Sequence, residues 1–376
     1  MKRKKPVISI FTTIWGHKSI GEAIRDALGD KYRIYFNFIE PNEISIKPYN
    51  MFYILFPSLF KLPFEVSQLK YISKIVEKYL SRPYTRKIEY LIKKQKPDIV
   101  ISAYFAFNFN LVKLSGKYKF TLINAIADPR TFHRLAVFPN AVNMVFDEYA
   151  KKKCLKFGIS KENVIISGWF VRKEFQKSYN RSKIRRSLDL STDKFTIVIV
   201  GGGEGTVSIL KILPAFADLK DKIQVIFICG KNKGLFRSLK LFRAMYELKN
   251  EGGTKFIVKG YTDNTHEYIQ VSDIVIGKAG PNLLFETIAT HTPFFAISHI
   301  AGQEDGNLEI IKKYKLGFVE ENPVRAIKLT RKIIRNPKIL KRFQKPLQRL
   351  SEYNNKSYKI LMEYIEEKLN TNSLSS

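Results

Sequence analysis

Residues 274–307 contain the feature that most constrains the fold of this chain, a strand, turn and helix followed by a second strand and a polar loop. An apolar run at 274–276 leads to a turn ending at Gly280, and Pro281 then favours the first position of a helix. A second apolar run at 294–297 has the length of a buried strand. This alternation is typical of an α/β fold, in which ligands bind at the carboxyl ends of the strands.

The turn at Gly280 also suits a phosphate group. Glycine lets the backbone approach a ligand closely, and a first-turn proline leaves the following amides, from Asn282 onward, directed outward. Glu286 lies about one and a half turns later, where its carboxylate can accept two hydrogen bonds from a ribose diol. For this segment alone, ordinary turn chemistry of an α/β fold is the alternative interpretation. The next loop adds side chains of the kind that bind sugar hydroxyls: Gln303, Glu304 and Asn307.

Strand and helix patterns alternate through the rest of the chain as well. A chain of 376 residues is too long for a single core and suits two domains. Further apolar runs of strand length, several of them followed by polar or glycine-containing loops, lie at residues 7–12, 33–39, 97–102, 121–124, 195–200, 225–229 and 256–258. We therefore expect two doubly wound domains, each with its own sheet.

Composition narrows the environment in which the chain works. Lys and Arg total 65 against 34 for Asp and Glu, and this net charge of +31 predicts attraction to anionic membranes or nucleic acid. The two cysteines, Cys154 and Cys229, form no metal-binding or disulfide pattern, which favours a reducing compartment. No apolar run reaches the length of a bilayer span or of a signal-peptide core. We expect a soluble or peripheral protein.

A basic helix after an aromatic segment favours the membrane as the anionic partner. The segment at 50–64 is apolar and broken by two prolines, and its aromatic residues include Phe52, Phe56 and Phe60. Bases then recur every four residues, at Lys70, Lys74, Lys78, Arg82 and Arg86. On a helix they would cover one broad face, opposite an apolar stripe of Leu69, Ile72, Val76 and Tyr79. This combination is typical of an interfacial membrane binder, and a solvated helix packed on the sheet is the alternative.

Several motifs together resemble a known enzyme family. Lys278-Ala-Gly-Pro281, Glu286 and the run at 302–307 resemble the donor-site signature of lipid glycosyltransferases that include monogalactosyldiacylglycerol synthase and bacterial diacylglycerol glucosyltransferase. The peptidoglycan N-acetylglucosaminyltransferase that acts on a lipid-linked muramyl peptide is a more distant relative. The resemblance implies a GT-B fold, two Rossmann-like domains facing across a cleft, with a UDP-sugar as donor. It places the first domain at 1–172, the second at 173–350, and a C-terminal helix at 351–376 that packs back on the first domain.

The resemblance extends to the acceptor side. The stretch 16–19 resembles the amino-terminal loop of the family, whose histidine is thought to assist the acceptor hydroxyl, so His17 is the expected base. The family usually has a run of glycines before this histidine, where this chain has Ile14 and Trp15. A loop with Asp, Thr and His, facing the acceptor in the family, corresponds to 127–133. It makes Asp128 and His133 the next candidates.

The remaining implied residues bind the donor. Arg172, at the crossing between domains, would reach the diphosphate. A glycine cluster after the strand at 195–200 is a phosphate cradle, and Tyr261 would lie against the base of the nucleotide. The full donor set is Arg172, Gly201, Gly202, Gly203, Gly205, Tyr261, Lys278, Gly280, Pro281, Asn282, Glu286, Gln303, Glu304 and Asn307.

The expected activity is inverting transfer of a hexose from a UDP-sugar to a membrane lipid such as diacylglycerol, by a peripheral protein at the cytoplasmic face of the cell membrane. The chain has no Asp-x-Asp metal signature, and we expect neither a metal, nor a cofactor, nor a specific nucleic-acid partner. The alternatives are a peptidoglycan-type N-acetylglucosaminyltransferase, a UDP-sugar epimerase, or a non-catalytic basic protein that binds membrane or nucleic acid. The choice of sugar depends on a few hydrogen bonds whose geometry the sequence does not reveal.

Overall fold

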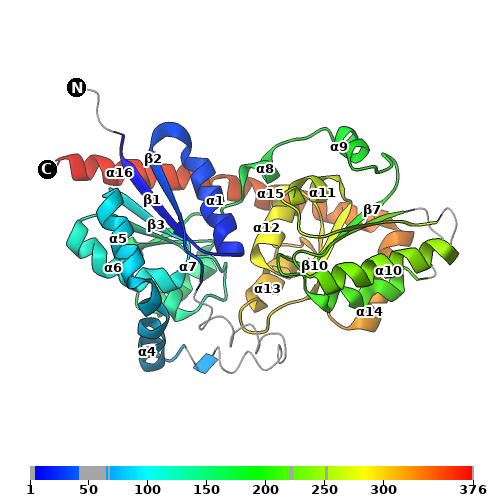
Figure 1. Ribbon diagram of the computed structural model, residues 1–376, viewed down its shortest axis with the longest axis horizontal. Helices are drawn as coiled ribbons and strands as arrows, with labels where there is room; N and C mark the ends of the chain where they lie inside the picture. The colour runs from blue at the N-terminus through cyan, green and yellow to red at the C-terminus, as the bar shows by residue number, and fades with distance from the viewer. Residues whose placement is uncertain are drawn as a thin grey trace. The chain divides into compact units, whose positions relative to one another are not determined.

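The computed structural model describes residues 5–41, 65–66, 68–217, 219, 223–249 and 253–374. Phe52, Phe56 and Phe60 lie outside these residues. The chain forms two compact units, each with one parallel six-stranded sheet (Figure 1), which confirms the expected pair of Rossmann-like folds. Unit 1 comprises Met1–Lys173, Ile300–Gly306 and Tyr353–Ser376, and unit 2 comprises Glu174–His299 and Asn307–Glu352.

The sheet of unit 1 has the strand order β2-β1-β3-β4-β5-β6. Its strands are β1 (Val7–Thr12), β2 (Arg33–Phe38), β3 (Ile99–Ser102), β4 (Thr121–Ala125), β5 (Val142–Val145) and β6 (Val164–Ile166). The helices of this unit are α1 (Gly16–Leu28), α4 (Lys70–Ser81), α5 (Thr85–Gln95), α6 (Phe105–Tyr118), α7 (Glu148–Lys156) and α16 (Ser357–Leu374). Short 3-10 turns are η1 (Gly29–Lys31), η2 (Arg82–Tyr84), η3 (Arg134–Ala136) and η4 (Lys161–Asn163). The order reverses between β1 and β3, and at such a switch point α/β sheets bind ligands.

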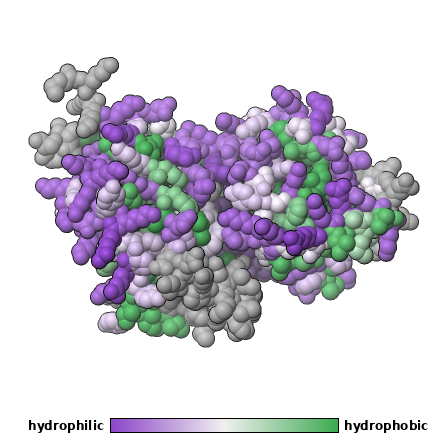
Figure 2. All heavy atoms as spheres, in the orientation of Figure 1, coloured by the Kyte–Doolittle hydropathy of each residue, from purple (hydrophilic) through white to green (hydrophobic). Residues whose placement is uncertain are grey.

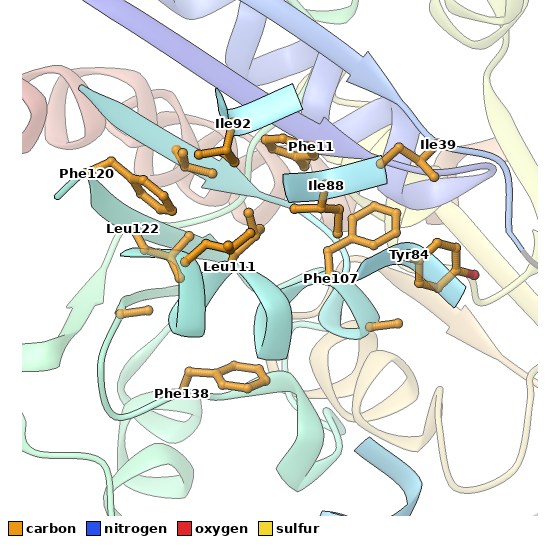
Figure 3. Packing of buried hydrophobic residues seen from close by; sticks show 14 residues of the cluster. Phe11, Ile39, Tyr84, Ile88, Ile92, Phe107, Leu111, Phe120, Leu122 and Phe138 are labelled. Carbon is orange, nitrogen blue, oxygen red and sulfur yellow. The ribbon is translucent and has the colours of Figure 1, made fainter. Parts of the chain in front are cut away.

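The core of unit 1 explains why its central strands read as continuous apolar runs. A parallel sheet is covered by helices on both faces, so its inner strands present apolar side chains to both sides. One cluster joins Phe11 of β1 and Val100 of β3 to Ile88 of α5 and to Phe107 and Leu111 of α6, all fully buried (Figure 3). This packing fixes the carboxyl ends of β1 and β3, where the site of this unit begins.

The sheet of unit 2 has the order β12-β11-β10-β7-β8-β9, which is the strand order of a Rossmann fold. Its strands are β7 (Thr196–Val200), β8 (Gln224–Ile228), β9 (Lys255–Lys259), β10 (Ile274–Lys278), β11 (Phe294–Ser298) and β12 (Gly317–Val319). The helices are α8 (Lys173–Gln176), α9 (Arg181–Ser187), α10 (Lys233–Lys249), α11 (Thr265–Val271), α12 (Pro281–Ala289), α13 (Asp305–Lys313), α14 (Pro323–Arg335) and α15 (Gln344–Asn355), with 3-10 turns η5 (Val207–Ala215) and η6 (Pro337–Phe343). Here the order reverses between the adjacent strands β7 and β10.

The end of the chain returns to unit 1, as expected. The Tyr353 hydroxyl donates to the carbonyl of Phe146 at 2.7 Å, and the amide of Trp169 donates to the Asn354 side chain at 3.1 Å. Farther along, α16 packs against α1, and Glu366 pairs with Lys31. These contacts confirm that the last helix packs on the first domain.

Candidate functional site

The loop at 201–205 extends the carboxyl end of β7 in unit 2. Among the residues that the structure describes, the amides of Gly202 and Gly203 have no hydrogen-bond acceptor. Gly205 adopts φ +75°, and a Cβ there would lie 1.9 Å from the carbonyl oxygen of Cys229, so only glycine fits. The Asn232 side chain donates to the Gly205 carbonyl at 2.8 Å and accepts the amide of Leu235 at 2.9 Å. Asn232, which the sequence reasoning missed, therefore holds this loop.

The turn between β10 and α12 lies at the same switch point. Gly280 precedes the helix in extended backbone, no side chain caps the helix, and its first turn has no acidic residue. The amide donors and the positive helix dipole at this end are therefore available to an anion. Asn307, predicted to bind sugar hydroxyls, donates its amide to the Ala279 carbonyl at 2.7 Å and so braces the turn. Its buried Oδ1 has no partner among the described residues.

The other predicted donor residues of unit 2 differ in exposure. Glu286 lies in α12 and is 8% exposed, so its carboxylate belongs to the buried side of the helix. Tyr261 follows β9 and is 56% exposed, with the Lys231 ammonium 6.0 Å from the centre of its ring. Lys278 is the last residue of β10. The α12 segment thus offers open amides at its start and a buried carboxylate farther along.

Gln303 and Glu304 occupy a segment that belongs to unit 1, although β11 and α13 on either side belong mainly to unit 2. Glu304 is 3% exposed, and its carboxylate accepts the amide of Ile300 at 2.8 Å. Gly302 donates its amide to Asp305 at 2.8 Å. Part of the polar character of this run therefore serves to shape the segment itself.

His17 marks the switch point of unit 1, where α1 begins after β1. Its Nδ1 lies 2.7 Å from the carbonyl oxygen of Ala103, which follows β3. Because a carbonyl only accepts, Nδ1 carries the proton and Nε2 keeps a free lone pair. Burial lowers the pKa of His17 to about 4, and the bond to Ala103, the smaller of the two effects, acts in the opposite direction. At neutral pH the imidazole is therefore uncharged, as a general base must be.

Trp15 occupies the position before α1 where the resembled family has glycine. Its backbone has φ 55° and ψ −131°, a conformation that glycine adopts readily and that costs a tryptophan roughly 1–3 kcal/mol. The side chain is 40% exposed. The backbone before His17 thus keeps a conformation typical of glycine, although a tryptophan occupies the position.

The secondary candidates in unit 1 have local partners. His133 accepts the amide of Leu135 at 3.0 Å through Nδ1 and so begins η3. Asp128 is half-buried in the loop after β4. The guanidinium of Arg172 lies 3.9 Å from the Glu22 carboxylate of α1, within unit 1. His133 thus has a structural function in addition to any contact with an acceptor.

The α4 helix of unit 1 presents a surface that is both apolar and basic. Tyr71 is 83%, Ile75 72% and Tyr79 62% exposed, and they follow one another at four-residue spacing. Lys74 and Lys78 are exposed on the same face. We call this set, with Arg82 at the end of the helix, the α4 face: Tyr71, Lys74, Ile75, Lys78, Tyr79 and Arg82. Figure 2 shows hydrophobic atoms at the lower left, over α4.

Two details of the predicted basic helix were wrong. Leu69 and Tyr79 were assigned to the stripe opposite the bases, but both are exposed; Ile72 and Val76, also assigned to it, are half-buried, as is Leu80. The helix ends at Ser81, because Pro83 has no amide to continue it, so Arg86 belongs to α5. The side chain of Lys70 is not among those described.

Within the described residues, no group of three or more His, Cys, Asp and Glu side chains is arranged to hold a metal ion. None of the helices that the structure describes is both long enough and apolar enough to cross a bilayer.

Comparison with known proteins gives matches over both units. The family description "Monogalactosyldiacylglycerol (MGDG) synthase" matches residues 16–171, and "Glycosyltransferase family 28 C-terminal domain" matches residues 196–307. Monogalactosyldiacylglycerol synthase 3 of Arabidopsis thaliana is 27% identical over 350 residues, covering 87% of this chain and 73% of the relative. The processive diacylglycerol beta-glucosyltransferase of Bacillus licheniformis is 26% identical over 283 residues, covering 75% of this chain and 72% of the relative. The crystal structure of MurG from Acinetobacter baumannii is similar in fold, with a TM-score of 0.59 and 12% identity over 97% of this chain and 100% of that chain.

Proposed function

Because the chain belongs to the family of monogalactosyldiacylglycerol synthases and processive diacylglycerol glucosyltransferases, we propose that it transfers a hexose from a UDP-sugar to the hydroxyl of diacylglycerol. The observation that carries this proposal is the position of the two family matches. The match over 16–171 contains His17 and the end of β3, and the match over 196–307 contains the switch point with Gly202, Gly203 and the open end of α12.

In the proposed reaction the lipid hydroxyl attacks the anomeric carbon of the sugar in a single displacement that inverts its configuration. A carbon–oxygen bond forms to the lipid as the bond from the anomeric carbon to the diphosphate breaks. The hydroxyl proton passes to Nε2 of His17, whose Nδ1 proton is held by Ala103. UDP leaves with the electron pair. Its added negative charge is stabilised by the amides of Gly202 and Gly203 and by the first turn of α12.

In this proposal, different side chains recognise the ribose, the base and the sugar of the donor. Glu286 accepts the ribose hydroxyls, and Tyr261 lies against the base. Gln303 contacts the sugar, while Glu304 and Asn307 both contact the sugar and shape the loops that carry it. Arg172 is the candidate for the diphosphate. His133 and Asp128 are the candidates for contact with the acceptor.

We further propose that the α4 face binds an anionic membrane surface, as a peripheral enzyme acting on a lipid requires. Exposed apolar side chains would enter the headgroup region, and Lys74, Lys78 and Arg82 would pair with anionic lipids. This contact would bring the enzyme to a lipid that does not leave the bilayer.

The function is tested by following UDP release and glycolipid formation on vesicles that contain diacylglycerol, with UDP-glucose and UDP-galactose offered separately. We expect release of UDP to match formation of a diacylglycerol hexoside. Release of UDP without any lipid product would contradict the proposed acceptor. Interconversion of UDP-sugars without transfer would support an epimerase instead.

A further inference from the structure

The segment Ile300–Gly306 is the part of the donor-binding sequence that lies in unit 1. It connects β11 to α13 and carries Gln303 and Glu304, which the proposed function places against the sugar. How precisely these side chains meet the sugar depends on what holds the segment. Besides the bonds within the segment, contacts from the loop that follows β4 hold it.

Thr131 makes two of these contacts through one hydroxyl group. Its Oγ1 donates to the carbonyl of Gln303 and accepts the amide of Gly306 at 3.3 Å. A hydroxyl has one proton and two lone pairs, so it can make both bonds at once. The two contacts bracket Glu304 and Asp305, and they span 172 and 175 residues of sequence.

Close packing at Gly306 leaves the segment little freedom beside Thr131. A Cβ at Gly306 would lie 2.6 Å from the Cβ of Arg130 and 3.2 Å from Oγ1 of Thr131. Backbone and side chain of the 130–131 pair therefore touch the start of α13 directly. A larger residue at 306 would push the segment away from the hydroxyl.

The residues next to Thr131 are themselves held by several bonds. Arg130 is 3% exposed, and its guanidinium donates to Asp147 at 2.6 and 3.1 Å. The same Asp147 accepts the amide of Ala150 at the start of α7, and Lys153 donates to the Arg130 carbonyl at 3.2 Å. A buried pair with these additional bonds leaves the backbone of 130–131 with one well-defined position.

We propose that Thr131 is a positioning residue, whose hydroxyl fixes the segment 300–306 and thereby sets Gln303 and Glu304 against the donor sugar. This inference rests on the proposed function, because it gives Gln303 and Glu304 a sugar to contact. It deepens that function by naming the residue on which sugar discrimination depends.

The test compares Thr131→Val, which keeps the shape of the side chain but loses the hydroxyl, with Thr131→Ser, which restores it. Thr330→Val is the matched control, because that buried hydroxyl only donates to Ala326 at 2.8 Å within α14. On the full-length protein we expect kcat to fall about tenfold in Thr131→Val, with the dissociation constant of UDP within about twofold of the wild type. Thr131→Ser and Thr330→Val should both behave as the wild type.

Two further readouts separate positioning from general stabilisation. The ratio of kcat/KM for UDP-glucose and UDP-galactose should move toward unity in Thr131→Val alone, since discrimination requires fixed hydrogen-bond partners. Hydrogen exchange in peptides that cover 300–306 should accelerate in Thr131→Val and return to the wild-type rate in Thr131→Ser.

Unchanged exchange and an unchanged donor ratio in Thr131→Val would overturn the inference. So would a loss of UDP affinity as large as the loss of kcat, because the residue would then serve the fold of the donor site. A wild-type protein that transfers no sugar to lipid would overturn the proposed function, and the exchange experiment would still decide whether Thr131 fixes the segment.

Discussion

The two units have equivalent switch points, but the groups at the two switch points differ in their chemistry. In unit 2 the strands β7 and β10 end in loops whose proposed anion-binding groups are backbone amides, which do not titrate. In unit 1 the strands β1 and β3 end beside a single imidazole, held at Nδ1 by a backbone carbonyl. In the proposed reaction the first site would stabilise the negative charge of the diphosphate as UDP leaves, and the second would accept a proton from the lipid hydroxyl. The comparison indicates that a shared topology provides equivalent positions at the strand ends, while the residues after the strands decide what chemistry each position can offer.

The largest expected effect tests the proton-accepting side. His17→Asn keeps a hydrogen-bonding side chain but cannot take the hydroxyl proton, so kcat should fall about a hundredfold or more. The dissociation constant of UDP, measured by calorimetry, should not change, because the proposed UDP site is in unit 2. His291→Asn is the control, since that histidine has φ 55°, a conformation that asparagine tolerates. Near-normal turnover in His17→Asn would make Asp128 and His133 the next residues to test.

The next effect tests the charge-binding side. Glu286→Ala removes the proposed acceptor of two ribose hydrogen bonds and should weaken UDP binding by roughly 2 kcal/mol, about 30-fold. Calorimetric titration with UDP measures this directly, with the exposed Glu309→Ala on α13 as control. Equal affinity in the wild type and in Glu286→Ala would remove Glu286 from the site.

The pH dependence of kcat separates the two sites in the wild type. The neutral imidazole is the active form, and the pKa of His17 is lowered to about 4, so activity should stay flat near neutrality and fall only as the pH approaches about 4. The unfolded chain has a histidine pKa near 6.5 and binds the extra proton first, so His17 makes stability decline as the pH falls from about 6.5 to 4. An acidic limb in kcat near pH 6.5 would show that His17 titrates as an exposed imidazole.

The smallest expected effect concerns the α4 face. Changes to this face of unit 1 should alter binding to membranes but not the affinity of unit 2 for UDP. Replacing Lys70, Lys74, Lys78 and Arg82 with Gln should lower binding to anionic vesicles at least severalfold at low salt and leave UDP affinity unchanged. A vesicle sedimentation assay measures this. An equal change of charge at the exposed α14 and η6 residues Lys328, Lys332, Arg335 and Lys338 is the control. Equal losses in both variants would mean that only total charge matters.

Local chemistry made much of the fold predictable from sequence. Pro281 at the start of α12 and the apolar runs of β7 and β10 depend on residues close together in the chain, and both kinds of element formed as expected. The end of α4 is also predictable from sequence, because Pro83 has no amide with which to continue the helix. The alternation of strands and helices likewise predicted two doubly wound sheets. It did not predict the strand order, which depends on pairings between segments far apart in the chain.

Contacts between distant residues account for what sequence reasoning missed. The pKa of His17 is lowered by burial, and its Nδ1 bonds a carbonyl 86 residues away, at Ala103; both depend on the fold. The bracing bond of Asn307 to Ala279 and the bond of Thr131 to Gln303 join segments that no local pattern connects. Motifs in the sequence therefore predict the candidate site residues, while the contacts that orient these residues are visible only in the fold.

Unit 1 is assembled from three separate stretches of chain, which determines the order in which it can be finished during synthesis. Domains generally fold as their residues leave the ribosome, beginning at the N-terminus. Yet the carbonyl of Phe146 and the amide of Trp169 gain their partners, Tyr353 and Asn354, only when nearly the whole chain has been made. The unit that begins to be synthesised first is thus the last to be completed. A nascent chain that stops before residue 353 would lack the contacts of Tyr353 and Asn354 and would expose that part of unit 1 to chaperones.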